Sequence, residues 1–70
     1  MIRVTVHVVG STKLCEAIDA LPELIHEYQI TVSRGSDIIR IDVHTSQGVD
    51  EIALAQQLQQ AAYVITAEVR

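Results

Sequence analysis

Hydrophobic and polar residues alternate along four segments of the chain. Residues 2–9 alternate with a period of two and are rich in β-branched side chains, which predicts a half-buried strand. The same pattern predicts strands at 24–33, 38–45 and 64–69, and the turn residues 34–37 join the second and third strands in a β-hairpin. The side chains expected to face the core are Ile2, Val4, Val6, Val8, Tyr28, Ile30, Val32, Ile39, Ile41 and Val43.

Two helices are expected between these strands. A first helix should begin after Gly10 with Ser11 or Thr12 as its N-cap, and it should end before Pro22. Asp50 and Glu51 should open a second helix, because negative charge is favourable at the positive end of the helix dipole. The expected apolar stripes are Leu14, Ala17, Ile18 and Leu21 in the first helix, and Ile52, Ala55, Leu58 and Ala62 in the second.

The resulting order β-α-β-β-α-β predicts an α+β fold, a ferredoxin-like βαββαβ sandwich. Right-handed crossovers give a four-stranded antiparallel sheet of order 4-1-3-2, with two helices on one face. Residues 1–70 should form a single domain, because no linker or low-complexity stretch divides them. One competing interpretation extends the first helix through Ile25 and shortens the second strand.

Composition excludes several classes of protein. Of the 70 residues, 49% are hydrophobic and 20% charged, which is too apolar for intrinsic disorder. The net charge of −4 argues against nucleic-acid binding by this chain alone. A single cysteine, Cys15, cannot form an internal disulfide, and no apolar run approaches the ~20 residues of a membrane span. We therefore expect a cytoplasmic domain without membrane insertion.

The sheet face opposite the helices is expected to be polar and bare. Small domains of this kind need additional burial, so we expect self-association into a dimer or larger assembly rather than a merely solvated face. The expected interface residues are Arg3, Thr5, His7, Arg40, Asp42 and His44. Pairing of the first and fourth strands should set Arg3 opposite Glu68, Thr5 opposite Thr66 and His7 opposite Val64.

No catalytic or metal site is expected. His7, His26 and His44 lack the spacing of metal-ligand motifs, and zinc or copper sites need three or four converging ligands. Cys15 has Glu16 beside it, and this negative charge opposes thiolate formation. Since no nucleophile–base or acid–base pair is present either, we expect no enzyme activity and no cofactor.

The hairpin turn is the candidate ligand-binding site. Arg34, Gly35, Ser36 and Asp37 place a cation, flexible backbone amides and an anion side by side. Arg34 or the Gly35 and Ser36 amides could bind the carboxylate of an amino-acid-like effector, and Asp37 its ammonium group. The same residues also form ordinary solvated turns.

Short motifs at the end of the first helix, in the second strand and at the start of the third strand resemble the RAM domain, the effector-binding domain of leucine-responsive (feast/famine) regulators, which is similar in shape to the ACT domain. The matching positions are Leu21, Pro22, Glu23, Leu24, Tyr28, Asp37, Ile38 and Ile39, with a weaker match at Ala61, Ala62, Tyr63 and Val64. The C-terminal domain of MgtC-type membrane proteins is also similar. The resemblance implies amino-acid binding at a subunit interface, with Asp37 as the position that carries over.

We therefore expect a non-catalytic regulatory module that self-associates and binds a small effector between subunits. The alternative is a ligand-free interaction or assembly domain, excised from a larger membrane or regulatory protein. A metal-handling ferredoxin-like domain is the third and weakest hypothesis.

Overall fold

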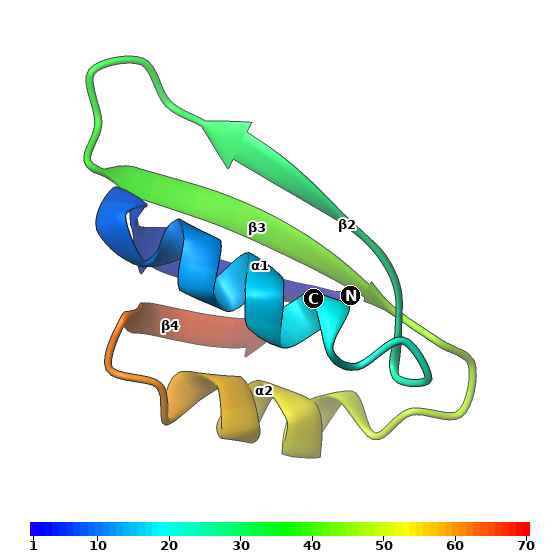
Figure 1. Cartoon of the computed structure of the whole chain (residues 1–70). Coiled ribbons are helices and arrows are strands. Elements are labelled where there is room, and N and C mark those ends of the chain that lie inside the picture. Colours follow the sequence, from blue (N-terminus) through cyan, green and yellow to red (C-terminus); the bar gives the residue numbers. More distant parts are fainter.

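The computed structural model describes residues 1–70 and contains the predicted elements in the predicted order (Figure 1). The strands are β1 (Ile2–His7), β2 (Ile25–Val32), β3 (Ile38–Thr45) and β4 (Val64–Val69); the helices are α1 (Ser11–Asp19) and α2 (Glu51–Gln59), and a 3-10 turn, η1 (Val8–Gly10), joins β1 to α1. All neighbouring strands are antiparallel, in the order β2-β3-β1-β4. Read from β4, this is the predicted order 4-1-3-2, and the fold is ferredoxin-like.

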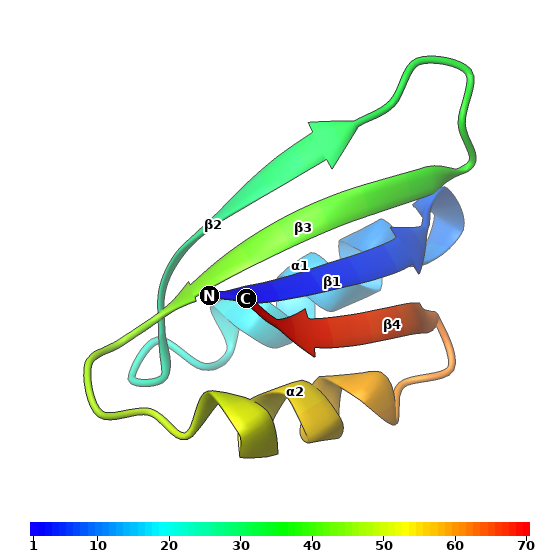
Figure 2. The same ribbon diagram turned by 180° about the vertical axis from the view of Figure 1, so that it is seen from behind.

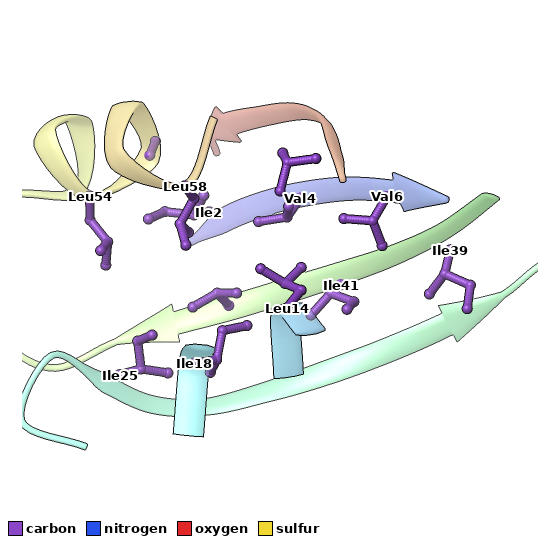
Figure 3. Close-up of a cluster of buried hydrophobic side chains, with 13 residues drawn as sticks. Ile2, Val4, Val6, Leu14, Ile18, Ile25, Ile39, Ile41, Leu54 and Leu58 are labelled. Atoms are coloured by element: carbon purple, nitrogen blue, oxygen red, sulfur yellow. The ribbon is translucent and has the colours of Figure 1, made fainter. Parts of the chain in front are cut away.

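One hydrophobic core lies between the sheet and the helices. The central strands β1 and β3 contribute alternate residues to it, as their patterns predict, and both helices add side chains to the same cluster (Figure 3). The buried residues are Ile2, Val4, Val6, Leu14, Ile18, Ile25, Ile39, Ile41, Val43, Leu54, Ala55, Leu58 and Val64. Because α1 and α2 reach one cluster, both pack on the same side of the sheet.

The junction between β1 and α1 differs from the prediction. β1 ends at His7, and Val8 is 44% exposed in η1 instead of facing the core. Gly10 occupies the N-cap position and makes no side-chain cap, while the Ser11 hydroxyl donates to the Val8 carbonyl at 2.7 Å. Because η1 leads directly into α1, the expected capping role of Ser11 or Thr12 is wrong.

The buried stripe of α2 is rotated from the predicted one. Leu54, Ala55 and Leu58 are buried, whereas Ile52 is 65% exposed and Ala62 lies beyond the helix. The reason is position: α2 runs alongside the outer edge of β4, so only the side of the helix facing the sheet centre meets the core (Figure 2). The predicted start of the helix is confirmed, because the Asp50 side chain accepts a hydrogen bond from the Ala53 amide at 3.2 Å.

The pairing of β4 with β1 is interrupted by a bulge. Thr66 lies opposite Thr5 and Glu68 opposite Arg3, as predicted. The register then shifts, so that Val64 pairs with Val6 and not with His7. An extra residue at the bulge turns Val64 to the opposite face of the sheet, where it joins the core.

The inward side of β2 is covered only near the start of the strand. α1 ends at Asp19, so the helix does not extend through Ile25, and β2 begins there. Tyr28 is partly buried, but Ile30 and Val32 are 49% and 64% exposed. Neither helix extends over the hairpin end of this border strand or over the hairpin itself (Figures 1 and 2). The expectation that Ile30 and Val32 belong to the core is therefore wrong.

Candidate functional site

The predicted effector site lies in a well-defined turn. The Ser36 amide donates to the Ser33 carbonyl at 3.1 Å, and Gly35 has a φ of 77°, which favours glycine. The Ser36 hydroxyl accepts from the Ile38 amide at 3.1 Å. On the other side, the Val8 amide donates to the Asp37 carbonyl at 2.7 Å. These bonds fix the turn to β3 and to η1.

In a single copy the charged groups of this turn face solvent. Arg34, Gly35, Ser36 and Asp37 are all exposed, and neither Arg34 nor Asp37 forms a salt bridge. None of the four residues lines a cavity. The turn thus offers a cation and an anion close together, without walls of its own to exclude water.

Three shallow hollows lie elsewhere on the surface. One, of about 340 Å³, lies between α1 and β2 and includes Asp19, His26 and Tyr28. A second, of about 300 Å³, lies between α2 and β4. The third, of about 350 Å³, surrounds the loop before α2. The first contains the titratable side chains of Asp19, His26, Glu27 and Tyr28, and the pKa of one of them is shifted.

Tyr28 is that residue. Desolvation by burial raises the pKa of its phenol above the ordinary 10.0, and the neighbouring Cys15 and Asp19 raise it further. Negative charge on either neighbour disfavours a phenolate, which keeps Tyr28 a neutral hydrogen-bonding group through the physiological range. The hollow therefore combines a neutral phenol with a carboxylate, chemistry that suits a cationic or hydrogen-bond-donating group.

The environment of Tyr28 predicts that its phenol ionises at a higher pH than an ordinary tyrosine. In a Tyr63→Phe background, we expect the phenolate absorbance of Tyr28 to appear with a midpoint above pH 10.0. The unfolded chain ionises first, so the contribution of Tyr28 to the free energy of unfolding is intact below pH 10 and falls as pH rises toward the folded-state pKa. Asp19→Asn should move the midpoint back toward 10, and a midpoint at or below 10 in the parent would contradict this environment.

The open face of the sheet carries the six predicted interface residues Arg3, Thr5, His7, Arg40, Asp42 and His44. The structure brings three of them together: Arg3 Nε lies 3.0 Å from Asp42 Oδ1, and Arg40 Nε lies 3.9 Å from Asp42 Oδ2. Asp42 thus neutralises part of the charge of two arginines on neighbouring strand positions. The other three predicted interface residues on this face are also polar: Thr5, His7 and His44.

The titratable groups do not assemble a metal centre. No group of three or more histidine, cysteine, aspartate or glutamate side chains converges. His7 lies at the end of β1, and His26 and His44 lie on β2 and β3.

Neither helix has the length and apolar character needed to cross a lipid bilayer.

One polar side chain with a defined structural role was not singled out by sequence. The Gln59 amide of α2 donates to the Ile65 carbonyl at 3.0 Å and accepts from the Ala67 amide at 2.6 Å. Gln59 is one of four glutamines expected to be mostly solvated, and nothing in the local pattern distinguishes it from Gln56 or Gln60. Its role depends on the position of β4 in the fold.

Comparison with known proteins adds no relatives. The chain matched no protein-family model, no curated protein and no solved structure. The resemblance to RAM and ACT domains therefore stays a prediction drawn from short motifs and topology.

Proposed function

We propose that this chain is a non-catalytic regulatory module that self-associates along β2 and binds a small amino-acid-like effector between copies. The observation that carries the proposal is the uncovered apolar border of the sheet. Ile30 and Val32, 49% and 64% exposed, pair with Ile41 and Ile39 and so lie on the core-facing side. Apolar surface continuous with a core, at the edge of a sheet, is typical of an interaction surface.

A second copy fits this border through its own β2. The strand pairs only with β3, so its outer edge has no partner strand, and it contains neither lysine nor proline to block strand addition. Antiparallel pairing of two β2 strands about a twofold axis is self-complementary. Registers centred on Gln29 or Ile30 keep the apolar sides together, with Tyr28 of one copy against Ile30 or Val32 of the other.

This arrangement also supports the effector site. In an antiparallel pair, the end of β2 in one copy lies beside the start of β2 in the other. The hairpin turn of the first copy would therefore approach the hollow of the second, which contains Asp19, His26 and Glu27. The second copy would supply the wall that the turn lacks. Arg34 would also face an acidic surface, which favours the pairing electrostatically.

A ligand-free assembly domain is the second candidate. It is favoured by the exposure of the turn at 34–37, which lines no cavity in a single copy. In that case the polar open face, with the Arg3–Asp42–Arg40 cluster, is the other surface available for a second copy. The two candidates differ in whether effector binding occurs and in which surface pairs.

We expect Val32→Lys to dissociate the assembly. Light scattering after size-exclusion chromatography should give more than one chain of 7.7 kDa for wild type at micromolar concentration, and one chain for Val32→Lys. Val9→Lys is the matched control, because Val9 is 87% exposed but lies outside β2. A monomeric wild type would overturn self-association, and an unchanged mass for Val32→Lys would move the interface away from β2.

Effector binding is tested by calorimetric titration with a panel of amino acids. We expect a ligand whose binding is abolished by Arg34→Ala or Asp37→Ala, with the melting temperature of the unliganded protein unchanged, since both side chains are exposed. Binding that survives both substitutions would place the site elsewhere. Absence of binding to wild type at millimolar ligand would leave the assembly domain.

A further inference from the structure

The helix layer of the fold does not reach the hairpin end of β2. α1 and α2 pack over the centre of the sheet and beside β4, and neither helix extends over this end of the border strand (Figures 1 and 2). Ile30 and Val32 lie on the helix side of the sheet there, because they pair with the buried Ile41 and Ile39, yet both are exposed. A further helix beside α1 would cover these two side chains and complete the second layer.

The flank of α1 that borders this gap is negatively charged. Cys15 and Asp19 lie beside Tyr28 of β2, so this side of the helix faces the border strand. Glu16 is exposed on the same flank, about one turn of the helix from Asp19. No lysine or arginine occurs at residues 14–33, and none of the four carboxylates in that stretch forms an ion pair within the chain: Glu16, Asp19, Glu23 and Glu27. The apolar gap is therefore bordered by negative charge that no cation of the chain neutralises.

We propose that this gap is the docking surface for a basic amphipathic helix of a partner protein. The apolar side of such a helix would cover Ile30 and Val32, and its lysines or arginines would face Asp19 and Glu16. A neutral or acidic helix would bury the same apolar surface but leave the carboxylates unpaired. The helices of a second copy fit less well, because α1 and α2 together contain a single cation, Lys13.

This docking surface goes beyond the proposed function and does not rest on it. Self-association would use the outer backbone edge of β2, whereas the partner helix would cover the inward side chains of the strand. Two β2 strands paired side by side would still leave those side chains without a covering layer. A wild-type protein that is monomeric would therefore contradict the proposed self-association and leave this surface as it is.

The probe is a fluorescein-labelled synthetic peptide of about 18 residues, which as a helix is roughly as long as the eight-residue strand β2. One face of the helix contains leucines and the other lysines, and the matched peptide has glutamates in place of the lysines. Fluorescence anisotropy should show saturable binding of the lysine peptide, weakened about tenfold or more by the exchange to glutamate. No binding of the lysine peptide at submillimolar protein, or equal binding of the two peptides, would overturn the proposal.

Variants of the protein locate the binding surface. Glu16→Lys should weaken binding of the lysine peptide about fivefold or more, whereas Glu68→Lys, the same change of charge on the open face, should leave it within about twofold. Ile30→Ser should weaken binding as well, and Ile52→Ser, at an exposed isoleucine of α2, should not. All four side chains are exposed, so circular dichroism should show every variant folded. Equal effects of the two charge changes, or of the two isoleucine changes, would place binding outside the gap and overturn the proposal.

Discussion

Ile41→Ala is expected to lower the free energy of unfolding by about 2–5 kcal/mol. Ile41 is fully buried on β3, the strand between β1 and β2, and pairs with Val4 on one side and Ile30 on the other. Truncating it leaves a cavity where the sheet meets the helices, and the fixed strands on both sides limit relaxation into that space. Urea unfolding followed by circular dichroism measures the loss.

Thr31→Ala is the matched control for this experiment. Thr31 lies on β2 beside Ile30 but points to the open face, opposite Arg40, and is exposed. Its truncation should change the free energy of unfolding by less than about 0.5 kcal/mol, as is usual for surface positions. Equal effects for the two variants would mean that the strand register is wrong, because a shift of one residue exchanges the two faces of every strand.

The central strands could be predicted from sequence because their burial follows from local alternation. In β1 and β3, alternate β-branched residues face the helices, and the intervening polar residues form the open face. Both strands lie in the middle of the sheet, and their inward hydrophobic side chains are buried together with side chains of both helices. The pattern of apolar residues therefore coincides with the pattern of burial, and the strand order follows from the connection rules.

The same reasoning fails at the edges of the sheet. Ile30 and Val32 have the alternation of Ile39 and Ile41, yet they stay exposed because no helix lies over the hairpin end of β2. Ile52 is exposed for a related reason, since α2 packs beside β4. Whether an apolar side is covered depends on where the helices rest, which is a tertiary property that periodicity does not contain.

The candidate site, too, could be predicted from the sequence only in part. The turn at 34–37 was predictable, because Gly35 permits the positive φ that the turn needs and the Ser36 hydroxyl accepts a hydrogen bond from the nearby Ile38 amide. Whether the turn is enclosed could not be predicted, because a single copy provides no wall for it. Gln59 was indistinguishable by sequence from its neighbours, because its function arises only when β4 lies within reach of its amide.

Gly10→Ala is expected to destabilise the fold by about 1–3 kcal/mol through overpacking. Gly10 is buried where η1 meets α1, and a Cβ there would overlap Tyr63 Cβ and lie 3.2 Å from Tyr63 Cγ. Its φ of −97° is open to any residue, so the cost comes from packing alone. Tyr63→Gly removes the overlapping carbon, so the cost of Gly10→Ala should be much smaller in that background. Thermal or urea unfolding of the four proteins measures the coupling, and strictly additive costs would mean that close contact with Tyr63 is not what requires glycine at this position.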